Sequence, residues 1–143
     1  MSKVKRISIT LPEEVLRDLD EVMKMIGAQN RSKVISNAII SYISATRWML
    51  GEGLVSGSIT LIYDHERGDA VRKITRIQHE FTNIIKATIH VHLSERLCLE
   101  IISVVGEVEK LKNLLNELRE IKAVYGVSSS LFPVEQEVVG SHQ

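Results

Sequence analysis

Four side chains that can bind metal are concentrated in residues 90–100, and their spacing predicts that they share one face of a β-hairpin. Side chains alternate between the two faces of a strand, so His90 and His92 lie on the same face. A turn centred near Glu95 would place Cys98 opposite His92 and Glu100 opposite His90, with Cβ atoms roughly 4.5 to 5.5 Å apart. Two imidazoles, a thiol and a carboxylate would therefore crowd together.

This set of donors favours a transition metal. Imidazole and thiolate ligands suit Zn, Cu or Ni, whereas Ca²⁺ and Mg²⁺ prefer oxygen. The two imidazoles and the thiolate are only three ligands and do not close a site, so a further donor is needed. The alternative is a pair of hydrogen-bonded histidines beside a free, buried cysteine, which is a common environment for cysteine. The opposite face of the first hairpin strand is aliphatic, with Ile89, Val91 and Leu93.

The missing donor is expected on the helix that precedes the hairpin, residues 69–86. Its apolar residues follow three-four spacing, and at about 100° per residue His79 falls on the opposite side of the helix. A histidine in that position is either a solvated surface residue or a ligand for another subunit. Because the hairpin lacks a ligand, we expect His79 of a neighbouring subunit to complete the site.

Length and composition fit one or two small globular domains, with 143 residues and 44% hydrophobic content. No run approaches the ~18 apolar residues of a membrane helix, and the N-terminus is polar and basic, so we expect a cytoplasmic protein without membrane contact. A single cysteine cannot form an internal disulfide. The net charge is zero, but residues 1–50 carry eight Lys and Arg against five acids. This asymmetry places any DNA-facing surface in the first third of the chain.

The first 50 residues are expected to form one strand and two helices. Residues 6–11 alternate between polar and apolar, Pro12 opens a helix that Gly27 ends, and Asn30 or Ser32 caps a second helix that runs to about residue 50. Such a segment has too small a core to fold alone. Two copies that pair their strands would form a ribbon that fits the DNA major groove. The alternative is a solvated edge strand of an ordinary dimerisation module.

Residues 3–48 resemble the ribbon-helix-helix DNA-binding family in their alternating strand, Leu-Pro, amphipathic helix, glycine and Asn-Arg-Ser sequence. The resemblance implies that base edges are read by Arg6, Ser8 and Thr10. It also implies that the N-terminus of the second helix holds a phosphate, at Asn30, Arg31 and Ser32.

A second domain is expected after a glycine-rich linker at 51–57. The predicted elements are a strand at 58–63, the helix at 69–86, strands at 88–93 and 97–105, a helix at 107–121 and a strand at 123–131. Their order, βαββαβ, predicts a ferredoxin-like sheet with two helices on one face. The fold class is therefore α+β, with a DNA-binding domain at 1–50, a metal-binding domain at 58–132 and a tail at 133–143 in which His142 is inert.

The chain as a whole resembles the nickel-responsive repressor family, NikR, through Gln78-His79-Glu80, His90-x-His92 and Cys98-Leu99-Glu100. The resemblance implies an ACT-type ferredoxin-like domain and one Ni²⁺ per chain. The ion would be held in a square plane by His90, His92, Cys98 and His79 of another subunit, with Glu100, His65 and Tyr63 nearby. It also implies a homotetramer, a dimer of dimers with a DNA-binding dimer at each end. The chain departs from the family at Lys33 and Asn37, where acids are usual.

The implied function is a nickel-dependent repressor that binds double-stranded operator DNA of nickel-uptake genes, with no other protein partner. Alternatives are a metal storage or delivery protein of the same fold, a regulator that responds to Cu, Co or Zn, an antitoxin, and an amino-acid sensor. Antitoxin tails are usually disordered, whereas residues 58–131 can form a core, and an amino-acid sensor leaves the His and Cys face unexplained. An enzyme is not expected, because no nucleophile–base pair or phosphate loop is visible.

Overall fold

The chain divides into a helical N-terminal unit, Met1–Ser41, and a C-terminal α+β unit, Tyr42–Gln143. The computed structural model describes residues 3–134. Of the predicted tail, residues 135–143 with His142 lie outside the described residues. No helix among the described residues is long and apolar enough to cross a bilayer. The predicted domain boundary at 51–57 stays a prediction.

Helix α1 (Glu13–Met25) closely matches its predicted range and ends at the predicted glycine. Gly27 has a φ of 67°, in the left-handed region, and its N–H donates to the Lys24 carbonyl. The N–H of Ala28 donates to the Met23 carbonyl at 2.9 Å. This Schellman arrangement occupies the last carbonyls of the helix and ends it.

Helix α2 (Arg31–Thr46) begins at Asn30, whose side-chain oxygen accepts the N–H of Lys33 at 3.0 Å. Asn30 is therefore the cap, rather than Ser32, the alternative that the sequence also allowed. The predicted helix to residue 50 continues only as the 3-10 helix η1 (Arg47–Leu50), a common form at helix ends. Trp48 within it is fully buried in the core of the C-terminal unit.

The predicted N-terminal strand is not formed within the described part of the single chain. Residues 3–12 belong to no helix or strand, and Val4, Ile7 and Ile9 are exposed. A strand needs hydrogen bonds from a neighbouring strand, and the expected neighbour is the same segment of a second copy. The ribbon therefore stays a prediction about two chains.

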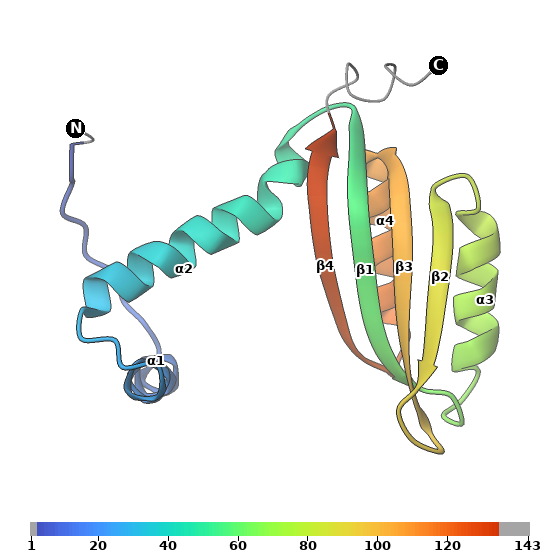
Figure 1. The fold of residues 1–143 in the computed structure, drawn as a ribbon, viewed down its shortest axis with the longest axis horizontal. Helices are drawn as coiled ribbons and strands as arrows, with labels where there is room; N and C mark the ends of the chain where they lie inside the picture. Colours follow the sequence, from blue (N-terminus) through green and yellow to red (C-terminus); the bar gives the residue numbers. More distant parts are fainter. Residues whose placement is uncertain (1–2, 135–143) are drawn as a thin grey trace. The chain divides into compact units, whose positions relative to one another are not determined.

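The C-terminal unit is a four-stranded antiparallel sheet with two helices against one face (Figure 1). The strand order is β2-β3-β1-β4, the order of a ferredoxin-like fold. This confirms the predicted βαββαβ architecture. Its elements are β1 (Leu54–Asp64), α3 (Ala70–Glu80), β2 (Ile85–His92), β3 (Leu97–Glu107), α4 (Val108–Glu120) and β4 (Val124–Val134).

The boundary between α3 and β2 differs from the sequence prediction, because the helix was expected to reach residue 86. It ends at Glu80, and only four residues separate it from the start of β2 at Ile85. The hydroxyl of Thr82 donates to the carbonyl oxygens of Gln78 and His79. A side chain that binds these carbonyls competes with continuation of the helix. As a result the hairpin is longer, and the short connection holds α3 close to β2.

Strand β1 begins at Leu54, four residues before its predicted start at 58. Gly57 lies in the segment that was predicted to be a glycine-rich linker, yet it pairs with Val104 on one side and Leu131 on the other. A Cβ atom on Gly57 would lie 2.0 Å from the carbonyl oxygen of Ser130. The glycine therefore permits a close approach between two strands.

We predict that Gly57→Ala destabilises the C-terminal unit by about 1 to 3 kcal/mol, the usual cost of forcing an extra methyl into a packed site. Thermal unfolding of the full chain measures the change. Gly126→Ala is the matched control, because Gly126 also pairs with β1 but a methyl group added there would meet no atom within 4 Å. Equal melting temperatures for the two variants would contradict the close approach.

Candidate metal centre

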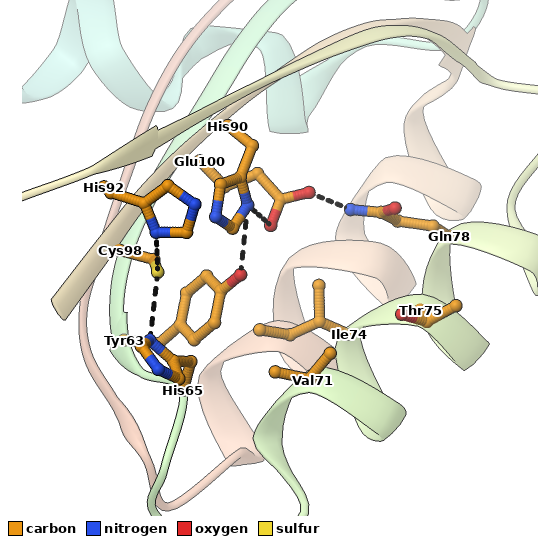
Figure 2. A pocket seen from close by; sticks show the side chains of 10 residues that line it. All are labelled: Tyr63, His65, Val71, Ile74, Thr75, Gln78, His90, His92, Cys98 and Glu100. Carbon is orange, nitrogen blue, oxygen red and sulfur yellow. Dashed lines mark hydrogen bonds and ion pairs between the residues drawn. The ribbon is translucent and has the colours of Figure 1, made fainter. Parts of the chain in front are cut away.

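The β2–β3 hairpin brings the predicted donors together in the predicted register. His92 pairs with Cys98, and His90 pairs with Glu100. Because all four side chains lie on the face turned towards α3, they point into the space between sheet and helix (Figure 2). One ligand atom from each of His90, His92 and Cys98 lies within 4.8 Å of the other two. The register of an antiparallel pair is thus what assembles this group.

These donors line a cavity of about 380 Å³ between the hairpin, the end of β1 and helix α3. The helix closes the cavity with a partly apolar wall. The lining residues are Tyr63, His65, Val71, Ile74, Thr75, Gln78, His90, His92, Cys98 and Glu100. The cavity is therefore a mainly apolar pocket with a group of polar side chains, which is a common character for binding sites.

Cys98 lies at the centre of the group, and 1% of its surface is exposed. Its Sγ is 3.5 Å from Nδ1 of His92 and 3.4 Å from Nδ1 of His65, which approach from opposite sides of the sulfur (Figure 2). Burial, and then the negative charges of Glu100 and Asp64, raise the pKa of the Cys98 thiol. In the metal-free protein this thiol is therefore neutral at physiological pH.

The donor set fits a transition metal ion. A single ion bonded to sulfur at about 2.3 Å and to an imidazole nitrogen at about 2.0 Å spans roughly the distance seen between Cys98 and His92. A bound metal cation also reverses the electrostatics of the cavity, since it deprotonates a coordinating thiol. The two carboxylates that disfavour the free thiolate would then offset the charge of the cation.

Glu100 and Tyr63 orient His90. Nδ1 of His90 lies 3.4 Å from the Tyr63 hydroxyl and 4.0 Å from Oε2 of Glu100. Burial raises the pKa of Tyr63, and the negative charge of Glu100 raises it further, so the phenol stays protonated. With Nδ1 facing these two groups, Nε2 of His90 is the nitrogen left for a metal ion.

Gln78 connects the group to helix α3, a role that we did not predict from the sequence. Its amide nitrogen donates a hydrogen bond to Oε1 of the buried Glu100 (Figure 2). A signal was present in the sequence, because Gln78 follows Ile74 by four residues and precedes Phe81 by three, on the apolar stripe of the helix. A polar residue at such a position predicts a buried polar partner.

His79 does not join the hairpin donors within the part of the chain that the structure describes. It is exposed on α3, one residue beyond the inward-facing Gln78. The position agrees with the predicted side of the helix. Its role as a ligand for a neighbouring subunit stays a prediction. His65 and Tyr63, which were expected near the site, both line the cavity.

The predicted DNA-contacting residues are exposed in the N-terminal unit. Arg6, Ser8 and Thr10 lie in the stretch before α1, and Ser32 lies in the first turn of α2. Asn30 caps α2, as described above. Arg31 forms an ion pair with Asp20 of α1 at 2.5 Å, so one of the expected phosphate ligands already has an acidic partner. The DNA-binding roles of these residues stay predictions.

Comparisons with known proteins agree with this site. A family model of the NikR C-terminal nickel-binding domain matches residues 56–131, which include the whole hairpin. A protein of Methanocaldococcus jannaschii that carries the name of a nickel-responsive regulator is 42% identical over 92% of this chain and 94% of its own length. One of Methanothermobacter thermautotrophicus with a similar name is 38% identical over 96% of this chain and 99% of its own.

Further matches cover less of the chain. A nickel-responsive regulator by name from Pyrococcus abyssi is 38% identical over 83% of this chain and 86% of its own. Among solved structures, the ACT domain of GTP pyrophosphokinase from Chlorobium tepidum matches 56% of this chain and all of its own, with a TM-score of 0.46 and 17% identity. No functional conclusion follows from a likeness at that level.

We predict that Glu100→Gln speeds alkylation of Cys98 in the metal-free protein at mildly alkaline pH. The Glu100 carboxylate raises the pKa of the thiol, so removal of its charge lowers that pKa. A lower pKa increases the fraction of thiolate, which is the reactive form. Mass spectrometry of iodoacetamide-treated protein measures the rate. Glu107→Gln, on the same strand but exposed, is the control. A rate for Glu100→Gln no higher than that of the control would contradict this electrostatic coupling.

Proposed function

The chain belongs to the family of nickel-responsive regulators, and we propose that it represses transcription by binding operator DNA when Ni²⁺ occupies the cavity behind the β2–β3 hairpin. The observation that carries this proposal is the convergence of His90, His92 and Cys98 within 4.8 Å, inside the segment that matches the nickel-binding family model. The proposal places the protein in the cytoplasm, where DNA and a reduced thiol are available. Genes for nickel uptake are the proposed targets.

One Ni²⁺ per chain is proposed, held by the three hairpin donors and by His79 of a second copy. The exposure of His79 supports this, because its ring is free to reach a neighbouring molecule. The adjacent Gln78 binds Glu100 inside the cavity. The helix that presents His79 outward is therefore attached to the hairpin that holds the other three donors.

The proposed assembly is a homotetramer formed as a dimer of dimers. Both helices of the C-terminal unit cover the same face of the sheet (Figure 1), and apolar side chains on the other face are exposed. Ile89 and Val91 project from β2 on the side away from the cavity, as their register with β3 requires. A patch of this kind favours association. The predicted N-terminal ribbon would form the other contact between chains that a dimer of dimers needs.

When bound, nickel supplies bonds to donors from two copies at once, and so favours the arrangement of subunits in which those donors meet. The protein residues determine what that arrangement changes. Glu100 accepts a hydrogen bond from the Gln78 amide on α3 and faces His90 on β2. A displacement of either element would therefore disturb the contacts of the other. Any ligand that favours one arrangement also raises the affinity for a second ligand that favours it. Nickel and DNA would therefore strengthen each other's binding.

DNA contacts are proposed for Arg6, Ser8 and Thr10 at base edges and for the start of α2 at a phosphate. The side chain of Asn30 binds one N–H of the first turn, that of Lys33. The other free N–H groups of the first turn can bind an anion. The excess of basic residues in the first 50 positions supports this placement.

We predict that His92→Ala abolishes the effect of nickel on DNA binding but leaves the nickel-independent, salt-sensitive binding intact. Sites are selected from a random duplex library with nickel-loaded wild type, and affinities are measured with and without nickel. Nickel should tighten wild-type binding by roughly tenfold or more, a common size for coupled sites. Arg6→Ala should lose selective DNA binding and keep nickel binding. If Arg6→Ala changes nothing, the protein is a nickel carrier; if His92→Ala keeps the nickel response, the proposed switch is wrong.

Mixing variants tests whether His79 acts between copies. We predict that His79→Ala and His92→Ala each lose the nickel–thiolate absorption band, and that refolding the two together restores part of it. A mixed assembly pairs the intact His79 of one variant with the intact hairpin of the other, which is possible only if the ligands come from different chains. Each variant refolded alone is the control. If the mixture shows no stronger nickel–thiolate band than either variant alone, His79 binds nickel within its own chain or does not bind it at all.

A further inference from the structure

The turn between the two ligand strands is attached to the rest of the sheet by an ion pair outside the donor group. The turn follows His92 at the end of β2 and leads to Cys98 near the start of β3. Within it, the N–H of Leu93 donates to the carbonyl of Leu97 at 2.8 Å, and the Ser94 hydroxyl accepts the N–H of Leu97 at 3.1 Å. These local bonds close the turn without fixing it to β1.

Asp64, the last residue of β1, provides that attachment. Its side chain is 3% exposed, and its Oδ2 lies 2.5 Å from Nη2 of Arg96 in the turn. Its Oδ1 accepts the N–H of Glu66 at 3.0 Å. The carbonyl of Arg96 in turn accepts the N–H of His65 at 3.0 Å. Both the side chain and the main chain of Arg96 are therefore bound to the segment that ends β1.

The topology leaves few other restraints on this end of the hairpin. Strand β2 is at the edge of the sheet and pairs with β3 alone within the described chain. The ladder between β1 and β3 ends at the pair formed by Asp64 and Leu97. Past that pair, the bonds to Arg96 are what hold the turn against β1. A shift of the turn would change the separation of His92 and Cys98, which flank it.

The charge on Asp64 is maintained in spite of its burial. Burial alone raises the pKa of this carboxyl, but hydrogen bonds from the Glu66 N–H and the Arg96 guanidinium outweigh that effect and lower the pKa below its usual range. A buried charge of this kind is stable only with its partners in place. The attraction to Arg96 therefore acts throughout the neutral pH range.

We propose that Asp64 is a positioning residue of the metal site, which acts through Arg96 to hold the turn and so sets the spacing of His92 and Cys98 before metal binds. The proposal rests on the proposed nickel site. It also concerns His65, which directly follows Asp64 and whose Nδ1 lies 3.4 Å from the Cys98 sulfur. One ion pair thus restrains the cysteine and the histidines on either side of it.

The first test is nickel affinity, measured in full-length protein by competition with a chelator. Asp64→Asn and Arg96→Gln should each weaken binding by about tenfold to a hundredfold, the usual effect of removing a group that orients a metal ligand. The double variant should bind no more weakly than the single variants, because the same contact is already lost. Arg96→Lys, which keeps the charge, should restore part of the affinity.

Glu66→Gln is the matched control. The Glu66 carboxylate lies 3.4 Å from Nε of the same Arg96, but its side chain is 58% exposed. An exposed pair contributes little, so this variant should bind nickel with the affinity of the wild type. The comparison separates the buried attachment from the mere presence of an acid near Arg96.

The second test needs no metal. Hydrogen–deuterium exchange of the apo protein should be faster for residues 92–97 and for His65 in Asp64→Asn and Arg96→Gln, while peptides from α4 keep the wild-type rate. A local attachment changes local opening, whereas loss of overall stability accelerates exchange everywhere. If the wild type binds no nickel, the proposed function fails, and the exchange experiment still tests the attachment.

Unchanged turn exchange and nickel affinity in both single variants would overturn the proposal. So would equal acceleration in the turn and in α4, which would show that Asp64 acts on general stability. If Asp64→Asn fails to fold, Arg96→Gln decides the matter alone, because the Arg96 side chain is 61% exposed.

Discussion

The register of the β2–β3 pair is the constraint on which the site depends. Because strand side chains alternate, pairing His92 with Cys98 also pairs His90 with Glu100. A slip of β2 by one residue would turn both histidines to the other face and bring Ile89 and Val91 into the cavity, while Cys98 and Glu100 on β3 kept their places. The two faces of β2 differ completely in chemistry, with His90 and His92 on one and Ile89 and Val91 on the other. The pattern that folds the hairpin is therefore also the pattern that assembles the donors.

Two buried carboxylates connect this hairpin to its surroundings, and each does so through one partner. Glu100 binds the Gln78 amide on α3, and Asp64 binds the Arg96 guanidinium in the turn. A buried charge is unfavourable unless its partners are correctly placed. Such groups therefore specify position more than they add stability. The first contact relates the site to the helix that carries His79, and the second fixes the spacing within the hairpin.

Much of the architecture followed from local pattern. The ferredoxin-like order, the limits of α1 and the pairing of the donors were predictable because each depends on alternation, helical spacing or a breaker such as Gly27. The errors have equally local causes. Thr82 ends α3 early through its own hydroxyl bonds, and Gly57 serves a close strand contact rather than a linker. The contact between Asp64 and Arg96 joins residues 32 apart, and no spacing rule relates them. The predicted N-terminal ribbon would need strands from two chains, so a single chain does not test it.

The proposed switch requires nickel to be held by the hairpin sulfur together with histidines from two chains. X-ray absorption at the nickel edge, on protein loaded with one ion per chain, tests this most directly. We expect one sulfur and several imidazole nitrogens bound to each ion, with the sulfur contribution absent in Cys98→Ser. A spectrum with only oxygen and nitrogen neighbours in the wild type would contradict it.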